Sequence, residues 1–424
     1  MLNKRILAIS SVVLGVAIVG FGVYVFQKPI EISDDAQAII KMVKYPEYEN
    51  TLVNRPFFMA LGIEADTDEN AVELGKLRYH RNWQLLAQNT TKANALDDTP
   101  EIQKLLNNAK VFTEDDKAFI QTWQQAANDG QQDEFLKNHQ KEMQSILAKY
   151  STQINRYGNV YSDDYLELPL SNAGIVVTPR NSREMHALLL AKIWLNPEQP
   201  QLKMQQYQRY LAQLRRVQTV SDLTPLSQLS NLRKMNNVIQ AMSELAVSSK
   251  MQGIKIEPLT PQEMSIENGM AEEILMQNRD TKSTTQEDMR KKIPKNLFLN
   301  QTTANLLPII ELSKMSYQQF IPALTKGVHS KPYAIPLKYK SYENVLTIGP
   351  KTEDYVDWAI SPRVVDYHIH LFNAIQSGKS LGALNVQQTY GEFYEENQQW
   401  CLRMPKEFTS RIKQKELCLK RPVN

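Results

Sequence analysis

The sequence predicts an all-α protein: a multi-helix body, built as an irregular helical bundle with extended connectors, behind one N-terminal transmembrane helix. Three observations lead to this prediction. An uncharged run of 21 residues stands near the N-terminus, glycine is scarce at 15 of 424 residues, and apolar side chains recur at spacings of three and four. Scarce glycine disfavours a turn-rich β-sandwich or barrel, and the spacing is that of one face of an α-helix.

The uncharged run, Ile6–Phe26, has the length of a membrane-spanning helix. At about 1.5 Å per residue it extends roughly 30 Å, the thickness of the hydrocarbon core of a bilayer. A cleaved signal peptide is the alternative, but its apolar region has about 7–15 residues and ends in small residues. This run is longer, and its exit at Tyr24–Phe26 is bulky. We therefore expect residues 1–28 to form a cytoplasmic stub and an uncleaved signal anchor.

The charges that flank the run predict its orientation. Lys4 and Arg5 precede it, whereas Glu31 and Asp34 follow. Positive residues are retained on the cytoplasmic side, so we expect the N-terminus inside and the body, residues 29–424, outside. The predicted topology is a membrane crossed once, with the N-terminus in the cytoplasm and the body outside it.

The net charge of +3 lies entirely within residues 1–28, so the body sums to zero. A neutral body is a poor nucleic-acid binder, because binding to phosphates requires a concentrated basic face. One basic stretch, residues 402–424, holds seven Lys and Arg against two Glu. A functional interpretation is contact with anionic lipid headgroups or an acidic partner; a solvated terminal helix is the simpler one and is preferred.

The two cysteines, Cys401 and Cys418, are separated by 16 residues. In an oxidising compartment an isolated pair is most simply an intrachain disulfide. Closing a loop of this size stabilises a fold by about 3 kcal/mol on the chain-entropy estimate. A metal pair or a redox-active dithiol fits less well, because the spacing is not C-x-x-C and no histidine lies between them. We predict a disulfide that closes the basic segment 401–424.

Start signals and apolar stripes locate the helices of the body. Thr113 precedes three acidic residues and caps a helix through Lys117–Asn128, and Thr224-Pro225 opens another. Residues 135–158 are predicted as one long amphipathic helix with His139 in the core. Further helices are expected at 181–194, 207–217, 262–279, 301–327, 354–376 and 385–399. Extended connectors are expected at 161–170, 253–260 and 330–349, and the last suggests a division of the body near 328–350.

No motif in the sequence predicts a catalytic, cofactor-binding or metal-ligating residue. Ser377–Ser380 resembles the end of a phosphate-binding loop, but the first glycine is replaced by Asn373 and the segment follows a helix. Gly378 is better explained as a helix C-terminal cap. His368 and His370 would share a face only on a strand, and their surroundings indicate a helix. The acid pairs at 163–164, 272–273 and 395–396 are interpreted as solvated helix faces.

A resemblance to a known group of proteins adds to these observations. Residues Asn54–Gly62, the helical series at 181–249, Asn300–Asn305 and the spaced Asn344, Gly349 and Tyr355 resemble segments of uncharacterised, N-terminally anchored, exported α-helical proteins of proteobacteria. The resemblance is scattered over much of residues 45–375. It implies a bacterial envelope location and an α-helical body, and it implies no functional residues.

Together these observations predict a membrane-anchored periplasmic accessory protein, a scaffold or chaperone-like factor with a protein partner in the envelope and no cofactor. A non-enzymatic role is preferred. The alternative is an envelope hydrolase that acts on peptidoglycan, lipid or peptide through residues that the sequence does not identify. A small-ligand sensor is a third interpretation, although the five residues before the anchor leave no cytoplasmic output domain.

Overall fold

The structure, a computed structural model of the chain, describes residues 30–42, 55–87, 96–161, 181–219, 225–278, 294–331, 333–336, 339–340, 351–385, 391–397, 399–412 and 416–420. The predicted anchor Ile6–Phe26 lies outside these residues, as do the acid pair at 163–164 and much of the predicted division near 328–350. Within the described ranges, no helix has both the length and the hydropathy needed to cross a membrane.

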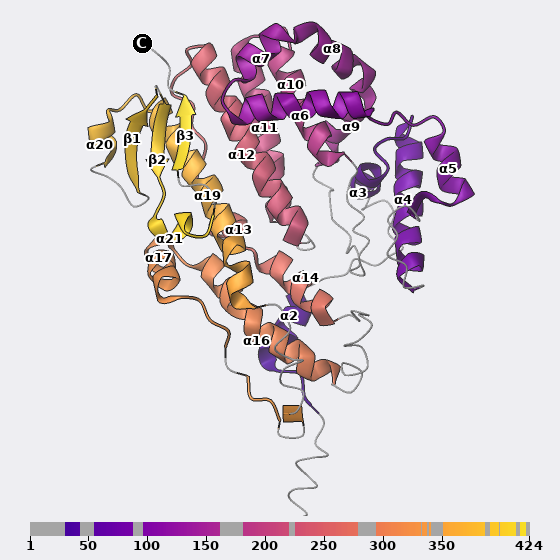
Figure 1. Cartoon of the computed structure of the whole chain (residues 1–424), viewed down its shortest axis with the longest axis vertical. Coiled ribbons are helices and arrows are strands. Elements are labelled where there is room, and N and C mark those ends of the chain that lie inside the picture. The colour runs from indigo at the N-terminus through magenta and orange to yellow at the C-terminus, as the bar shows by residue number, and fades with distance from the viewer. Residues whose placement is uncertain are drawn as a thin grey trace, which may run out of the picture.

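Helices make up most of the described chain, which agrees with the predicted all-α class. In chain order they are α2 Asp34–Met42, α3 Arg55–Leu61, α4 Asp68–Ala87, α5 Pro100–Leu106, α6 Glu114–Asn128, α7 Gln132–Asn138, α8 Gln140–Lys149, α9 Ser151–Val160, α10 Ser182–Leu195, α11 Pro200–Gln218, α12 Pro225–Ser248, α13 Pro261–Met264, α14 Glu267–Asn278, α16 Lys295–Lys314, α17 Tyr317–Lys326, α19 Thr352–Gln376, α20 Leu381–Asn385 and α21 Lys406–Thr409. They form an elongated body (Figure 1).

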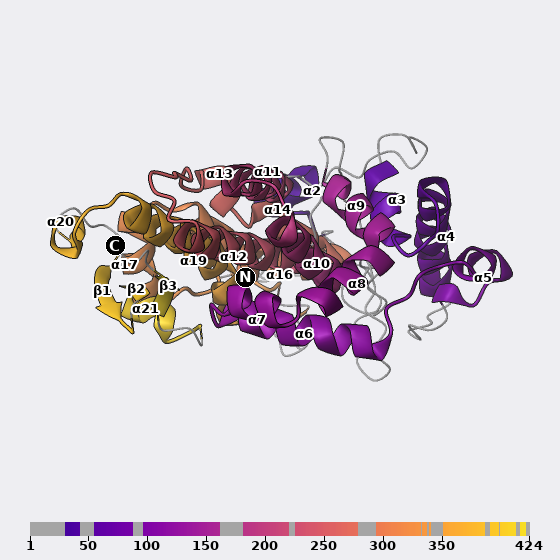
Figure 2. The ribbon, with the colours of Figure 1, turned by 90° about the horizontal axis from the view of Figure 1, so that it is seen from above.

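The two long helices α12 and α19 pack against each other along the middle of the body (Figure 1). Their side chains, such as Met235 and Ile239 of α12 and Val365 and Ile369 of α19, are fully buried in the main core. Seen from above, α3, α4 and α5 lie at one end of the molecule and the strands at the other (Figure 2). The core is therefore organised around α12 and α19, and the more peripheral elements are attached to its two sides.

Helix boundaries follow the sequence signals in some places and depart from them in others. Thr113 forms the predicted capping box, since its hydroxyl accepts the N–H of Asp116 at 3.1 Å. The helix predicted over 135–158 is wrong as a single element, because it breaks at His139 and Tyr150 into α7, α8 and α9. The break at Tyr150 directs its hydroxyl to the Asp116 carboxylate at 2.6 Å. His139 is exposed and stacks on the Phe135 ring, so its assignment to the core is wrong.

Helices α3 and α4 form a hairpin whose backbones touch. A Cβ on Gly75 would lie 1.9 Å from the carbonyl oxygen of Phe58, and one on Gly62 would lie 2.0 Å from that of Ala71. Glycine is required at both positions because any side chain would collide with main chain. Beside this contact the rings of Phe58 and Tyr79 pack edge to face, with centroids 5.9 Å apart.

Arg156 of α9 fastens this hairpin to the rest of the body. Its Nη1 donates to the carbonyls of Ile63 at 2.7 Å and Ala65 at 2.9 Å, and its Nε donates to the Asp68 carboxylate at 2.9 Å. The guanidinium is buried, so its bonds to the two carbonyls are shielded from competing water, whereas its partner Asp68 is exposed. The α3–α4 hairpin is thus held by close backbone packing within and by one buried arginine from outside.

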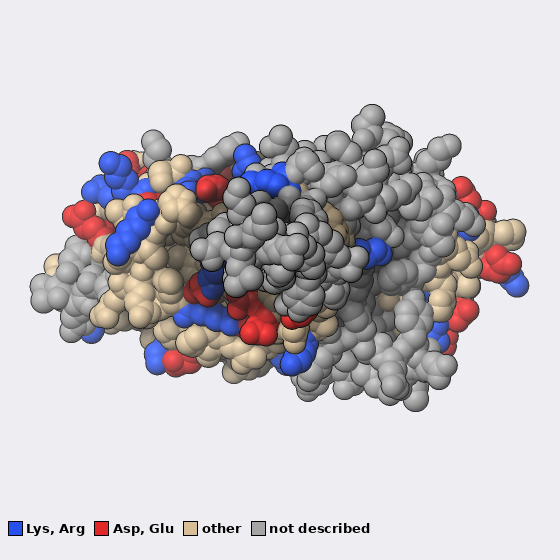
Figure 3. Space-filling model, turned by 90° about the horizontal axis from the view of Figure 1, so that it is seen from below, with Lys and Arg blue, Asp and Glu red and all other residues tan. Residues whose placement is uncertain are grey.

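The first described residues are bound to α16 at the lower end of the body. The side-chain amide of Asn296 donates to the carbonyl of Ile30 at 2.8 Å. Asn300 donates to the carbonyl of Glu31 and accepts the N–H of Ser33, both at 2.9 Å. Helix α2 then packs against α14 and α16. On the described part of this lower face, basic and acidic side chains are intermixed (Figure 3).

The C-terminal region contains a three-stranded antiparallel sheet in the order β1 Glu392–Glu396, β2 Gln399–Arg403 and β3 Glu416–Lys420. The helix expected at 385–399 and the solvated terminal helix expected in 402–424 are therefore wrong. Alternation explains the difference, because Leu417 and Leu419 are buried while their neighbours are more exposed, the period of a strand. The sheet packs against α19 and α12.

Candidate functional site

An open cleft is lined by residues of α8, α9, α10 and α11, the helices in the upper part of Figure 1. Its volume is about 890 Å³, within the range of known ligand-binding pockets. The described residues that line it are Gln144, Leu147, Ile154, Asn155, Gly158, Asn159, Leu189, Lys192, Ile193, Leu195, Asn196, Pro197, Gln206, Arg209, Tyr210 and Gln213.

The deeper part of this lining is apolar. Ile154 of α9, Leu189 and Ile193 of α10 and Tyr210 of α11 are all buried, and they form the floor of the cleft. Because each also belongs to the main hydrophobic core or packs on it, the floor is continuous with the folded interior. An apolar ligand group that reached this floor would exchange water for hydrocarbon contact, at about 25 cal/mol per Å² of apolar surface buried.

Gly158 widens the cleft at its floor. A Cβ at this position would lie 3.5 Å from Leu189 Cδ1, an ordinary van der Waals contact. Gly158 is inside α9, where glycine is less favourable than alanine by about 1 kcal/mol. Packing therefore does not require glycine at this position, which lines the cleft beside Leu189.

The rim of the cleft is rich in side-chain amides. Six of them line it, from α8, α9, the end of α10 and α11: Gln144, Asn155, Asn159, Asn196, Gln206 and Gln213. Each amide offers an acceptor and two donors. Two cations, Lys192 and Arg209, complete the polar lining, and none of the described lining residues is acidic or a histidine. Lys192 donates to Asn155 across the rim, and Gln206 donates to the nearby Glu198 at 2.7 Å.

A buried polar cluster lies beneath the floor, where α9, α10, α11 and α12 meet. Lys234 of α12 donates to the hydroxyl of Tyr161 at 2.7 Å. Its Nζ also lies 5.1 Å from the ring centroid of Tyr161 and 5.6 Å from that of Tyr157, within cation–π range. Burial opposes the charge of Lys234, but its interactions with Tyr157 and Tyr161 outweigh that effect and raise its pKa.

His186 joins this cluster to the cleft. Its Nδ1 is 2.9 Å from the hydroxyl of Tyr210, the aromatic residue of the floor. Burial, together with the smaller effect of the positive charge of Lys234, lowers the pKa of His186 to about 3. His186 is therefore neutral at physiological pH. The cluster involves α9, α10, α11 and α12, so three of the four helices that line the cleft are held together by buried contacts beneath it.

The disulfide predicted between Cys401 and Cys418 is present, with the sulfur atoms 2.05 Å apart. The two cysteines are directly opposite each other in β2 and β3. Lys420 at the end of β3 donates to the carbonyl of Gly130, which ties the sheet to the turn between α6 and α7. The basic segment is thus partly incorporated in the fold, with β3 packed against α12 and α19.

The other sequence candidates are placed apart from the cleft. His368 and His370 lie on α19, where His368 Nδ1 is 2.9 Å from the side-chain oxygen of Asn236 and His370 is 3.4 Å from the Asp366 carboxylate. Gly378 follows the end of α19 with a φ of 67°, as a C-terminal cap requires. In the described ranges, no three His, Cys, Asp or Glu side chains come together as a metal site would need.

The acid pair Glu272-Glu273 is buried, so its interpretation as a solvated face is wrong. The Glu273 carboxylate accepts the hydroxyl of Tyr355 at 2.8 Å. This pair lies on α14, a helix that contributes no described residue to the cleft.

The sequence did not identify the cleft or the cluster beneath it. His186, Tyr210 and Lys234 come from three helices, and no local spacing connects them. One sequence signal was available: Lys234 lies between buried apolar residues of α12, where a charge requires partners from elsewhere. Gly158, placed at the end of a helix by the sequence pattern, is inside α9.

No protein-family model, no curated protein and no solved structure matches this chain. The function proposed below therefore depends on the sequence and on the geometry of the described residues.

Proposed function

We propose that this protein is a membrane-anchored accessory factor of the bacterial envelope that holds part of a partner protein in the cleft between α8–α9 and α10–α11. The cleft itself carries this proposal. Its apolar floor offers hydrophobic contact to a bound segment, and its amide-rich rim offers hydrogen-bond donors and acceptors. A hydrolase would need an acid–base pair or a nucleophile with its base beside the substrate, and the described lining offers neither.

The location is part of the same proposal. Ile6–Phe26 would anchor the chain in the inner membrane, with the body in the periplasm and a partner in the envelope. The disulfide between Cys401 and Cys418 supports an oxidising compartment. The resemblance to exported, N-terminally anchored proteins of proteobacteria supports the same location.

A scaffold or chaperone-like role agrees with the fixed walls of the cleft. Lys234, His186 and Tyr210 connect the helices below it, so the site needs little rearrangement before binding. A preformed site lowers the entropic cost of association. We therefore propose that binding a partner, rather than converting a substrate, is the task of this surface.

Site-specific photocrosslinking in intact cells tests the proposal. A photoreactive amino acid at Gln213, on the rim, should capture a defined envelope protein. The same amino acid at Gln205 is the matched control, because Gln205 is exposed on α11 and does not line the cleft. Filling the cleft through Gly158→Leu should reduce the Gln213 product at least about fivefold, since a bulky side chain would cover Leu189.

The proposal is wrong if Gln213 and Gln205 give the same products. It is also wrong if Gly158→Leu leaves the Gln213 product unchanged while the variant unfolds at the same denaturant concentration as the parent. Release of a peptide, glycan or lipid fragment by the purified chain, abolished by Gly158→Leu, would instead favour the envelope hydrolase.

A further inference from the structure

We propose that the occupant of the cleft is an extended segment of the partner in which apolar and acidic side chains alternate. This inference rests on the proposed function and specifies what the cleft recognises. It combines three properties of the described lining: amides on both walls, an aliphatic floor, and two cations without a lining acid.

The amides are suited to a main chain that is not paired with anything else. An extended segment presents one N–H and one C=O per residue, and each must be satisfied when it leaves water. Asn155 and Asn159 stand one turn apart on α9, and Gln206 and Gln213 stand two turns apart on α11. The two walls thus offer donors and acceptors on both sides of a chain lying in the cleft. A folded helix would have satisfied these main-chain groups internally and would leave the amides without partners.

The floor then selects every second side chain of the occupant. Side chains of an extended segment alternate between opposite faces. Those on one face would lie on Ile154, Leu189 and Ile193, which are aliphatic and buried. The space above Gly158 allows them to approach α9 closely. Apolar residues at alternate positions of the occupant match this floor.

The charges of the rim predict what lies on the other face. Lys192 of α10 and Arg209 of α11 are both exposed at the cleft. The described lining itself holds no acid, and Glu198, which accepts the side-chain amide of Gln206 at 2.7 Å, lies next to the lining residue Pro197. An acidic side chain of the occupant would meet two cations, whereas a basic one would be repelled by both. An exposed aromatic platform, typical of glycan sites, is not among the described lining residues, because Tyr210 is buried.

The test measures the binding of short, end-capped, fluorescein-labelled peptides to the full chain in detergent micelles. The first peptide alternates leucine and glutamate, and two others carry lysine or glutamine in place of glutamate. We expect the glutamate peptide to bind about tenfold or more tighter than the lysine peptide, with the glutamine peptide between them. The preference should shrink at high salt, since the rim charges are exposed. A glutamate peptide with N-methylated leucines should bind about tenfold more weakly, because each methyl group removes a main-chain donor.

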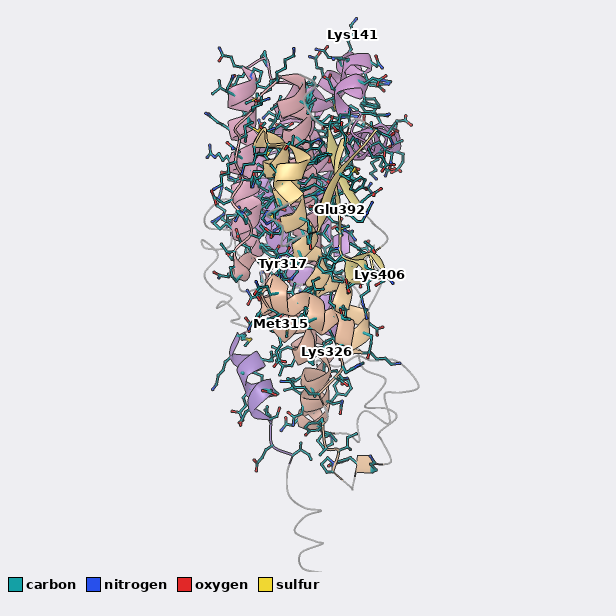
Figure 4. The ribbon with its side chains drawn as sticks, turned by 90° about the vertical axis from the view of Figure 1, so that its left-hand side faces the viewer. Lys141, Met315, Tyr317, Lys326, Glu392 and Lys406 are labelled. Carbon is teal, nitrogen blue, oxygen red and sulfur yellow. A yellow bond between two sulfur atoms is a disulfide. The ribbon has the colours of Figure 1, made fainter. Side chains whose placement is uncertain are left out.

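Protein variants separate the cleft from general charge. Lys192→Gln combined with Arg209→Gln should weaken the binding of the glutamate peptide about fivefold or more and leave the binding of the glutamine peptide unchanged. Lys104→Gln with Lys326→Gln removes the same net charge from exposed positions on α5 and α17, and should change neither (Figure 4 shows Lys326). Both double variants change exposed side chains, so neither is expected to disturb folding.

The outcomes also distinguish this inference from the proposed function. Equal binding of the glutamate and lysine peptides, or equal effects of the two double variants, would overturn the inference about the occupant. If Gln213 still captured an envelope protein in cells, the proposed function would stand with a different occupant. A glycan or a folded helix that bound in the cleft and displaced the glutamate peptide would also overturn the inference.

Discussion

The α3–α4 hairpin and the α9 wall of the cleft each contain a helix-interior glycine, but the two glycines have different surroundings. A Cβ on Gly75 would lie 1.9 Å from a main-chain oxygen, whereas a Cβ on Gly158 would have its nearest neighbour, a leucine methyl group, at 3.5 Å. Packing requires glycine at Gly75 and merely tolerates it at Gly158. The hairpin is thus shaped for stability, and the wall of the cleft keeps space that stability does not require.

The largest expected effect is at Gly75. Gly75→Ala forces α3 and α4 apart, and we expect it to lower the free energy of unfolding by about 3–5 kcal/mol. Chemical denaturation of the full chain measures this. Gly382→Ala is the control, because nothing lies within 4 Å of a Cβ there and its φ is not in the left-handed range. A Gly75→Ala protein as stable as the Gly382→Ala protein would show that the two backbones are not in contact.

The next largest effect is expected at Arg156, which bonds the α3–α4 hairpin to α9. Arg156→Met removes the bonds to Ile63, Ala65 and Asp68 and leaves two carbonyls without this donor, at a cost of about 2–4 kcal/mol. Compared with the parent, the variant should show faster amide hydrogen exchange in α3 and α4, with a smaller change in α10–α12. Arg403→Met is the control, since its ion pair with Glu392 is exposed and is worth about 0–1 kcal/mol. Uniform loss of protection across the chain would mean that the hairpin is not a separable region.

A third prediction concerns acid, to which the layer beneath the cleft should be sensitive. Burial lowers the pKa of His186 to about 3 from a reference value of 6.5, so the unfolded chain binds a proton that the native protein does not. Stability from this residue is therefore complete above pH 6.5 and falls as the pH is lowered toward 3. At pH 5 the loss is about 2 kcal/mol at most.

His186→Gln tests this acid sensitivity, because glutamine has no proton to gain. The free energy of unfolding of the variant should fall less between pH 7 and pH 5 than that of the parent, by about 1–2 kcal/mol. His329→Gln, at an exposed histidine, should behave like the parent. Parallel curves for His186→Gln and the parent would contradict a neutral, buried His186.

The smallest expected effect has the opposite sign. Gly158→Ala should raise the free energy of unfolding by about 0.5–1 kcal/mol, because the methyl group fits over Leu189 and alanine favours the helix. The same variant should weaken capture at Gln213, since the floor becomes shallower. A loss of stability would mean that packing requires glycine at Gly158 as it does at Gly75, and the two regions would not differ in this respect.

Local signals explain which parts of the fold were predictable. Thr113 and Pro225 favour a helix start through side chains that act within one turn, and α6 and α12 begin there as expected. The strands at 392–420 are only five residues long, and charged residues at their ends obscure the alternation. The helix break at Tyr150 coincides with a hydrogen bond from its hydroxyl to Asp116, a residue distant in sequence, so no local rule predicts this contact.

The site was less predictable than the fold because its parts belong to separate helices. Cys401 and Cys418 could be paired from their number alone. The cleft depends on how α8–α9 sits against α10–α11, and periodicity reports which residues of a helix are buried without saying what they face. Lys234 of α12 shows the limit most clearly, since its partners Tyr157 and Tyr161 lie in and just after α9, three helices earlier in the chain.

The bonds from Asn296 and Asn300 to the chain at Ile30–Ser33 have a mechanical consequence. A body on a loose tether would sweep through every orientation that its linker allows. Here the first described residues beyond the proposed anchor already belong to the packed body. A tether to the proposed anchor would therefore join the body at the end that holds α2 and α16, away from α10 and α11 of the cleft (Figure 1).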